Sequence, residues 1–260
     1  MITFGWNGQE FCRDHPVSAS SFGFRFGYSF FETFRVLDGK IYELEGHQTL
    51  LRHNCQKARV PWKLAFSGIP EALLEQLKKR TGMLRQYISL VAPDQGSQCH
   101  WIFEDRLPHW EEQREKGLSL VLADAPYQAA FPGSKSGNYL FNFRAHQSAR
   151  ESGADECLLW NVEKNIISAS MGNFLYSDGK NWFTPPVTDG ARPGIIRALL
   201  LKAGLIQEKS CTVEDLSHLS AAILTNSWMG AVPVRQIKEI SLPAPRLSVP
   251  ILQFVDKNYG

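Results

Sequence analysis

The stretch FFETFRVLDGKIYEL, residues 30–44, predicts a β-hairpin. Apolar and aromatic residues dominate its first half, and Asp38-Gly39 is a dipeptide typical of the tight turn between antiparallel strands. A second hairpin is indicated by NFLYS at 173–177, followed by Asp178-Gly179 and by NWFTP at 181–185. Because parallel strands need long crossover connections, these hairpins exclude a simple doubly wound sheet. The sequence therefore predicts an α+β fold.

Helical patterns alternate with further strands along the rest of the chain. GHQTLLRHNCQKARV, residues 46–60, has the apolar spacing of a helix and ends before Pro61. Other helices are expected at 71–80, 138–152, 193–204 and 248–259, and other strands at 85–92, 118–125, 156–160, 165–170, 221–227 and 234–240.

The periodicity is lost in APYQAAFPG, residues 125–133, and we interpret this stretch as an interdomain linker. We therefore expect a smaller N-terminal α+β domain at 1–124 and a larger C-terminal α+β domain at 134–260.

Composition restricts the possible partners. The 260 residues carry 28 Lys and Arg against 26 Asp and Glu, a net charge of +2 without long runs of one sign. Nucleic acid or an anionic membrane is therefore not expected as the main partner, and a small-molecule substrate is. The N-terminus lacks the pattern of a signal peptide, and no apolar run is long enough to span a membrane.

Five scattered cysteines, at positions 12, 55, 99, 157 and 211, fit neither a disulfide framework nor a zinc motif. No metal is expected, and the reducing cytoplasm is the simplest location. Cys55 lies in a helical pattern and is interpreted as a small buried apolar residue rather than a nucleophile.

Lys135 is the most conspicuous candidate for chemistry. It lies in GSKSGNYL, residues 133–140, with no carboxylate within four residues on either side. An isolated lysine in such a loop is usually solvated, whereas a nucleophilic amine needs a site shielded from water. The position at the end of the expected linker would suit a cleft between domains.

Three further features would suit a ligand with a phosphate group and a ring. ARPGIIR, residues 191–197, opens a helix and leaves the amides of Ile195 and Ile196 free for an anion. TNSWMG, residues 225–230, offers the Ser227 hydroxyl at a strand end, and Tyr139 offers a phenol. Taken singly, each feature is better explained as an ordinary helix start, a strand-end turn and a packed tyrosine, respectively.

Taken together, these stretches resemble the fold type IV pyridoxal-phosphate enzymes, which include branched-chain and D-amino-acid aminotransferases and 4-amino-4-deoxychorismate lyase. The resemblance runs nearly the whole length of the chain. It rests on WNGQEF, FRFGYSFFETFRVLDGK, LEGHQTLL, GSKSGNYL, ESGADECLLW, ISASMGNFLYSDGKNWFTPP, RPGIIRALLL and TNSWMGAVPV, in family order.

The resemblance implies a two-domain fold of the D-amino-acid aminotransferase type and a homodimer with its active site near the interface. It also implies that Lys135 binds pyridoxal phosphate covalently. Ile195, Ile196 and Ser227 would then hold the phosphate, Tyr139 the ring hydroxyl, and the residue at position 168 the ring nitrogen.

Two departures from the family pattern affect the cofactor site. Where the family has a glutamate facing the pyridine nitrogen, this chain has Ser168, and a hydroxyl does not compel the nitrogen to stay protonated. Where the family has a phosphate-binding arginine, this chain has Leu50. Arg52 lies about 200° further around the helix, so it replaces that arginine only if the helix shifts register; otherwise it is a solvated surface residue.

TNSWMGAVPV and HQTLLRHNCQ resemble the lyase versions of their segments more than the aminotransferase versions. Elimination of pyruvate from 4-amino-4-deoxychorismate creates an aromatic ring, so it needs less electron withdrawal by the cofactor than transamination does. The expected activity is therefore this elimination, which gives 4-aminobenzoate for folate synthesis. A branched-chain or D-amino-acid aminotransferase is the first alternative, and a non-catalytic relative with weakened cofactor binding is the second.

Overall fold

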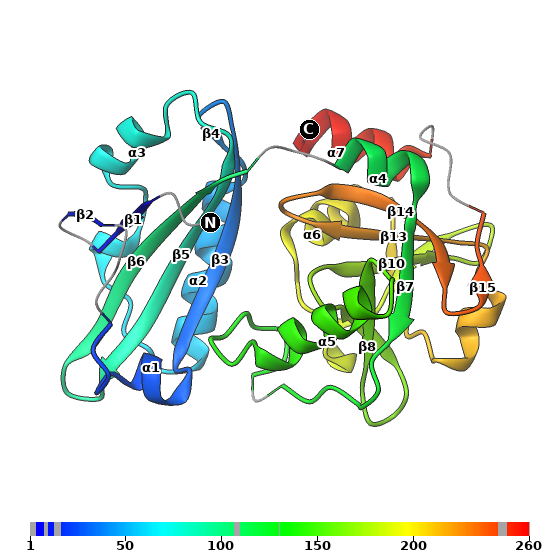
Figure 1. Ribbon diagram of the computed structural model, residues 1–260, viewed down its shortest axis with the longest axis horizontal. Coiled ribbons are helices and arrows are strands. Elements are labelled where there is room, and N and C mark those ends of the chain that lie inside the picture. Colours follow the sequence, from blue (N-terminus) through cyan, green and yellow to red (C-terminus); the bar gives the residue numbers. More distant parts are fainter. Residues whose placement is uncertain are drawn as a thin grey trace. The chain divides into compact units, whose positions relative to one another are not determined.

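The computed structural model describes residues 4–7, 10–12, 17–106, 110–129, 131–243 and 249–259. The chain divides into two compact units (Figure 1). Unit 1 comprises residues 1–108 and 134–139, and unit 2 comprises residues 109–133 and 140–260. Each unit contains a β-sheet and helices, so the predicted α+β class is confirmed.

Unit 1 is built on an antiparallel sheet with the order β2-β1-β6-β5-β3-β4. Its strands are β1 (Phe4–Trp6), β2 (Phe11–Cys12), β3 (Ser29–Leu37), β4 (Lys40–Ile41), β5 (Gly82–Ala92) and β6 (Gly96–Asp105). Its helices are α1 (Phe22–Phe26), α2 (Leu44–Lys57), the 3-10 helix η1 (Leu64–Phe66) and α3 (Glu71–Leu77).

The first predicted hairpin is present as β3 and β4. Asp38 and Gly39 have φ angles of 47° and 80°, the left-handed conformation that a tight hairpin turn of this kind requires at both positions. Because β4 has only two residues, it pairs with Val36 and Leu37 alone. The beginning of β3 is therefore not covered by β4.

The core of unit 1 forms where the sheet meets its helices. Apolar side chains of β3, β5 and β6 pack with two from α3; the buried members are Phe34, Val36, Leu73, Leu77, Leu84, Trp101 and Phe103. Helix α2 buries His47, Leu51, Asn54 and Cys55, so one face of it points inward. Cys55 is fully buried, as the helical pattern predicted, and burial raises the pKa of its thiol to about 12, which disfavours the thiolate.

Unit 2 contains a mixed sheet with the order β12-β11-β10-β13-β14-β7-β8-β9, with β15 paired to β14. Its strands are β7 (Leu118–Leu122), β8 (Glu156–Trp160), β9 (Ile166–Ala169), β10 (Asn173–Ser177), β11 (Trp182–Thr184), β12 (Gln207–Glu208), β13 (Ala221–Asn226), β14 (Gly230–Ile237) and β15 (Ile240–Ser241). Its helices are α4 (Trp110–Lys116), α5 (Leu140–Glu151), α6 (Ile195–Lys202) and α7 (Pro250–Tyr259), with 3-10 helices η2 (Val187–Asp189) and η3 (Glu214–His218).

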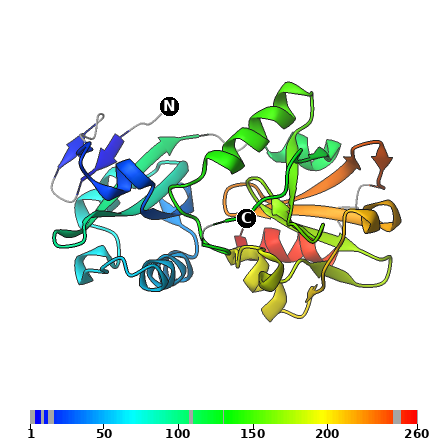
Figure 2. The ribbon, with the colours of Figure 1, turned by 90° about the horizontal axis from the view of Figure 1, so that it is seen from below.

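Two hydrophobic clusters hold unit 2 together. One lies among the strands and includes Leu120, Leu158, Phe174, Leu224 and Val234. The other joins β8 and β9 to α5 through Ala149, Cys157, Leu159 and Ile167. Helices α5 (green) and α7 (red) cover different parts of this unit (Figure 2).

The division of the chain differs from the expected domains. Strand β7, at 118–122, was expected in the N-terminal domain, but it pairs in parallel with β14 and with β8 in the sheet of unit 2. The expected linker at 125–133 also belongs to unit 2, although residue 130 lies outside the described residues. Residues 134–139, expected at the start of the C-terminal domain, belong to unit 1.

In the part of the chain that the structure describes, no helix is long and apolar enough to cross a membrane.

Candidate functional site

The segment that carries Lys135 is attached to β3 by backbone hydrogen bonds. The Phe31 amide donates to the carbonyl of Lys135 at 2.9 Å, and the Gly137 amide donates to the carbonyl of Ser29 at 2.8 Å. This segment pairs with the beginning of β3 through Phe30 and Ser136, at an edge that the short β4 does not reach. A Cβ atom at Gly137 would lie 2.3 Å from Ser29 Oγ and 3.0 Å from the Gly27 carbonyl oxygen, so the two backbones are closely packed here. The backbone of Lys135 is therefore fixed to β3 of unit 1.

The Lys135 side chain contacts a hydroxyl group and an aromatic ring. Its Nζ atom is 3.3 Å from Thr33 Oγ1 and 5.0 Å from the centroid of the Phe31 ring. The same ring contacts Tyr139 edge-on at 5.4 Å and stacks on Tyr87 at 5.0 Å. Lys135 is half-buried, unlike a lysine on a solvated loop. Tyr139, which was expected to bind the hydroxyl of the cofactor ring, thus contacts the same Phe31 side chain as Lys135 does.

Helix α2 contributes two different faces to unit 1. On the buried face, His47 Nδ1 lies 2.9 Å from Glu32 Oε2, and Asn54 Oδ1 accepts from Ser134 Oγ at 3.0 Å, next to Lys135. Leu50 is half-buried. Arg52 is exposed and has no hydrogen bond or ion pair with the residues that the structure describes. Arg52 therefore occupies the solvated position that the register of the helix indicated.

In unit 2, three segments from distant parts of the sequence converge. Asn173, at the start of β10, is the cross-strand partner of Thr225 in β13. Asn173 Nδ2 also donates to the Arg192 carbonyl at 2.8 Å, just before α6. A Cβ atom at Gly194 would lie 2.1 Å from Asn173 Oδ1, and one at Gly172 would lie 2.8 Å from the Thr225 carbonyl. The structure thus brings together the segment after Ser168, the start of α6 and the end of β13, which leads into the turn that contains Ser227.

The groups at this meeting point are hydrogen-bond donors. Helix α6 starts after Gly194, which provides no side-chain cap, so the amides of Ile195 and Ile196 have no capping side chain. The Thr225 hydroxyl is buried and has no partner among the described residues. Ser227 is half-buried in the turn between β13 and β14. Uncapped helix amides beside hydroxyl groups form a site suited to an anion such as a phosphate.

Ser168 lies in β9 opposite Leu159 of β8 and is half-buried. Its hydroxyl makes no hydrogen bond with the described residues. The serine therefore offers a neutral polar group without adding a charge.

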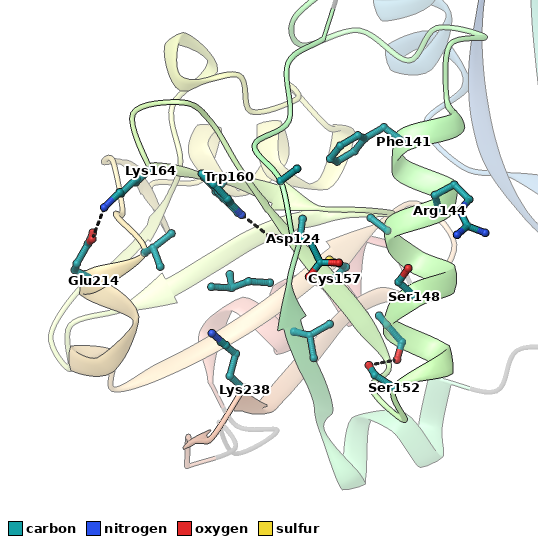
Figure 3. A pocket seen from close by; sticks show the side chains of 17 residues that line it. Asp124, Phe141, Arg144, Ser148, Ser152, Cys157, Trp160, Lys164, Glu214 and Lys238 are labelled. Atoms are coloured by element: carbon teal, nitrogen blue, oxygen red, sulfur yellow. Dashed lines mark hydrogen bonds and ion pairs between the residues drawn. The ribbon is translucent and has the colours of Figure 1, made fainter.

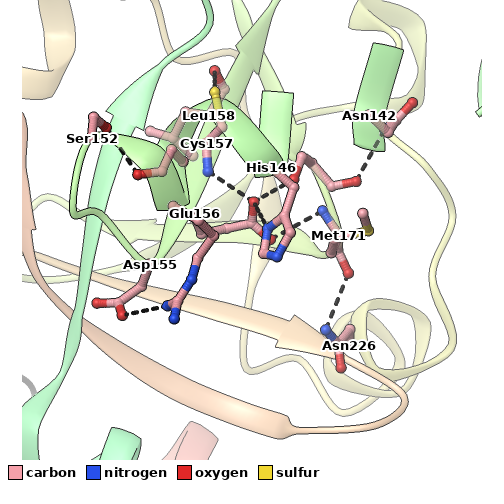
Figure 4. Close-up of polar contacts among 12 residues, drawn as sticks. Asn142, His146, Ser152, Asp155, Glu156, Cys157, Leu158, Met171 and Asn226 are labelled. Carbon is pink, nitrogen blue, oxygen red and sulfur yellow. Dashed lines mark hydrogen bonds and ion pairs between the residues drawn. The ribbon is translucent and has the colours of Figure 1, made fainter. Parts of the chain in front are cut away.

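Glu156, which the sequence patterns did not single out, is a carboxylate that lies close to this segment (Figure 4). Glu156 is buried and accepts hydrogen bonds from the Ser170 hydroxyl and from the Met171 amide. In the sequence, Glu156 is recognisable only as an acidic residue at the start of the apolar strand ECLLW. The sequence does not reveal that residues 170 and 171 donate hydrogen bonds to its carboxylate.

Unit 2 also contains a groove of about 860 Å³ between α5 and the ends of β7 and β8 (Figure 3). Trp160 donates to the Ala123 carbonyl at 2.7 Å on its wall, and Lys164 pairs with Glu214 at 3.5 Å at its edge. None of the site residues predicted from the sequence lines this groove. It is therefore separate from the place where Asn173, Thr225 and the start of α6 meet.

Comparisons with known proteins agree with this architecture. The family described as amino-transferase class IV matches residues 29–237. A putative branched-chain-amino-acid aminotransferase of Methanocaldococcus jannaschii is 24% identical over 86% of this chain and 84% of its own length. The aminodeoxychorismate lyase of Bacillus subtilis is 22% identical over 88% and 84%.

Solved structures show the same fold. A putative 4-amino-4-deoxychorismate lyase from Legionella pneumophila superposes with a TM-score of 0.80 at 23% identity, covering 94% of both chains. A hypothetical aminotransferase from Mycobacterium tuberculosis in its PLP-bound form superposes with a TM-score of 0.86 at 16% identity, covering 99% of both chains. The expected fold of the class IV aminotransferase type is thereby confirmed.

Proposed function

Because this chain belongs to the amino-transferase class IV family, we propose that it is a pyridoxal-phosphate-dependent lyase that eliminates pyruvate from 4-amino-4-deoxychorismate. The product would be 4-aminobenzoate, a precursor for folate synthesis. The observation that carries the choice of reaction is Ser168, a neutral residue without a described hydrogen-bond partner.

The residues present fit pyridoxal phosphate. The uncapped amides of Ile195 and Ile196 and the hydroxyl of Ser227 would hold the phosphate, and the unpartnered Thr225 hydroxyl is a further donor at the same place. Lys135 offers the amine that the cofactor needs for covalent attachment, and Tyr139 would hold the ring hydroxyl. When bound, pyridoxal phosphate withdraws electrons from the bonds at the carbon that carries the substrate amine.

In this reaction Lys135 moves protons. Its Nζ atom would take the proton from C4 of the substrate, the carbon that carries the amine. The C–O bond at the neighbouring carbon then breaks, and its electron pair leaves with the enolpyruvate oxygen. The ring becomes aromatic in this step, and the departing enolate takes up a proton on its CH₂ carbon to become pyruvate. Thr33 Oγ1, 3.3 Å from Nζ, would hold the amine in place.

Ser168 favours this reaction over transamination. A serine hydroxyl does not keep the ring nitrogen protonated, so the cofactor ring withdraws electrons less strongly. The elimination is less affected by this loss than transamination is, because formation of an aromatic product drives it. The carboxylate of Glu156 does not replace the missing glutamate, because its oxygens already accept from Ser170, Met171 and Cys157.

The second candidate is an aminotransferase for branched-chain or D-amino acids. It is favoured by the similarity to proteins with those names, at nearly the same identity as the lyase of Bacillus subtilis. A keto acid is a co-substrate for an aminotransferase but not for a lyase, which separates the two.

The test is an assay of purified protein loaded with pyridoxal phosphate. Release of pyruvate from 4-amino-4-deoxychorismate is followed with lactate dehydrogenase, with and without added 2-oxoglutarate. Pyruvate release without keto acid, lost in Lys135→Ala and kept in the exposed-lysine control Lys180→Ala, supports the lyase. Fast transamination of alanine, leucine or D-alanine without pyruvate release from aminodeoxychorismate contradicts it.

The proposal includes a homodimer, which the resemblance to the family implies. Light scattering coupled to size-exclusion chromatography tests it, and a single species of the mass of one chain, 29.4 kDa, contradicts it.

A further inference from the structure

Glu156, the first residue of β8, is the centre of a buried polar network in unit 2 (Figure 4). Its Oε1 atom accepts from the Cys157 amide at 2.8 Å, from the Ser170 hydroxyl and from His146 Nδ1 at 3.3 Å. Its Oε2 atom accepts from the Met171 amide at 3.2 Å. Only 7% of the residue is exposed, so the carboxylate exchanges water for these donors.

Two asparagines hold the same pair of residues from other directions. Asn142 of α5 donates to the Ser170 carbonyl at 3.0 Å, and Asn226 donates to the Met171 carbonyl at 3.1 Å. Residues 170 and 171 are thus fixed by side chains from two strands, β8 and β13, and from helix α5. These two residues lie between Ser168 and Asn173, the cross-strand partner of Thr225.

Asn226 extends the network to the turn that contains Ser227. Its Oδ1 atom accepts from the amides of Trp228 at 3.0 Å and Met229 at 2.8 Å, which closes the turn around Ser227. A continuous set of hydrogen bonds therefore runs from Glu156 through Met171 and Asn226 to the Ser227 turn.

We propose that Glu156 is a positioning residue for the cofactor site. By holding residues 170 and 171, its carboxylate fixes both the segment that carries Ser168 and, through Asn226, the turn that carries Ser227. The inference rests on the proposed function, because it assigns cofactor contacts to Ser168 and Ser227.

The network requires a carboxylate at position 156. Each oxygen of Glu156 accepts a backbone N–H group, one from Cys157 and one from Met171. In Glu156→Gln, either orientation of the amide places its NH₂ group against one of these donors. The variant therefore keeps the shape of the side chain but loses a backbone contact, and an unpaired buried donor is costly.

The experiment compares Glu156→Gln with Asp155→Asn. Asp155 is the neighbouring carboxylate, but it accepts from Ser119 and Arg150 and does not contact residues 170 and 171. Both variants remove one negative charge at the same end of β8. Hydrogen–deuterium exchange of the cofactor-free protein is measured on peptides that cover residues 168–173. Binding of pyridoxal phosphate to the cofactor-free protein is titrated by absorbance, and the pH dependence of the bound cofactor's absorption is recorded.

In Glu156→Gln we expect about tenfold faster exchange in these peptides and about tenfold weaker cofactor binding, the effect of one charge-assisted hydrogen bond. The pH dependence of the absorption should change as well, because the Ser168 segment moves relative to the ring. Asp155→Asn should leave all three unchanged. If Glu156→Gln does not fold, Ser170→Ala, which removes one donor of the same carboxylate, should show the same changes at smaller size.

The inference is overturned if Glu156→Gln has the exchange rates and cofactor affinity of the wild type. It is also overturned if Asp155→Asn shows changes as large as those of Glu156→Gln. In both cases the proposed function stands. A wild type that binds no pyridoxal phosphate overturns the proposed function first, and with it the cofactor role of Glu156. The exchange result, measured without cofactor, separates these two failures.

Discussion

The Nζ atom of Lys135 lies 3.3 Å from Oγ1 of Thr33, a residue of β3 that precedes it by 102 positions in the sequence. Backbone hydrogen bonds from Phe31 to Lys135 and from Gly137 to Ser29 bring these residues together. The lysine therefore has a defined position on a strand of unit 1. A solvated loop lysine has no such constraint, and this difference is what the first predictions test.

Lys135→Ala should abolish covalent binding of pyridoxal phosphate. In the wild type, borohydride should fix the cofactor to the peptide that contains GSKSGNYL, because reduction converts the carbon–nitrogen double bond to a stable single bond. Mass spectrometry of the digested protein identifies the modified peptide. The exposed Lys180 provides a matched control, since Lys180→Ala should bind normally. Turnover that persists in Lys135→Ala would exclude the lysine as the cofactor residue.

Thr33→Val should lower kcat by about fivefold, the effect of one neutral hydrogen bond of ~1 kcal/mol. The change preserves the branched shape of the buried side chain but removes the contact to Nζ. Cofactor affinity should stay within about twofold, because the contact is to the lysine and not to the phosphate. Steady-state kinetics and a cofactor titration check both expectations, with Thr49→Val on the exposed face of α2 as the control. An unchanged kcat would show that Thr33 does not orient the amine.

Leu50→Arg should tighten binding of pyridoxal phosphate by about tenfold, since a charge-assisted hydrogen bond to a phosphate contributes roughly 1.5–3 kcal/mol. Arg52→Ala should have no effect, because Arg52 is exposed and pairs with no described residue. Equilibrium titration of the cofactor-free proteins measures both. If Arg52→Ala lowers the affinity for the cofactor, or if Leu50→Arg does not raise it, Arg52 or another group already binds the phosphate.

Local patterns in the sequence predicted much of the fold. The Asp38-Gly39 hairpin, helix α2 and the start of α6 depend on turn chemistry, apolar spacing and a Pro-Gly pair within a few residues. Strand β6 was missed, although Gln98, His100 and Glu104 alternate with Cys99, Trp101 and Phe103, an alternation that only Ile102 interrupts. In that case the signal was present.

Long-range pairing was not predictable in the same way. Strand β7 has an apolar sequence that would suit either unit, and only its parallel pairing with β14, more than 100 residues later, assigns it to unit 2. The same holds for the candidate site. The sequence singled out Lys135, Ser168, Ile195 and Ser227, but the burial of Glu156 and its contacts to Ser170 and Met171 depend on how β8 and β9 pair.

His146 predicts a pH dependence of stability. The hydrogen bond to Glu156 raises its pKa above the ordinary value of 6.5, although partial burial and Arg150 oppose the shift. A raised pKa in the folded state means that the stabilisation is complete below about pH 6.5 and is lost as the pH rises through the folded-state pKa. The difference in urea midpoint between the wild type and His146→Gln should therefore be largest near about pH 5.5 and vanish at alkaline pH. A difference that is constant with pH would contradict the ion pair.

Ser168→Glu tests the residue on which the choice of reaction depends. A carboxylate at this position should keep the ring nitrogen protonated and so strengthen electron withdrawal by the ring. Transamination of alanine or leucine should then rise more than pyruvate release from aminodeoxychorismate, because aromatisation already drives the elimination. The half-buried position should also cost stability, since the new charge gains no described partner. Ser168→Ala, which stays neutral, separates the effect of charge from loss of the hydroxyl and should keep the wild-type ratio of the two activities. If Ser168→Glu leaves that ratio unchanged, residue 168 does not control the ring nitrogen.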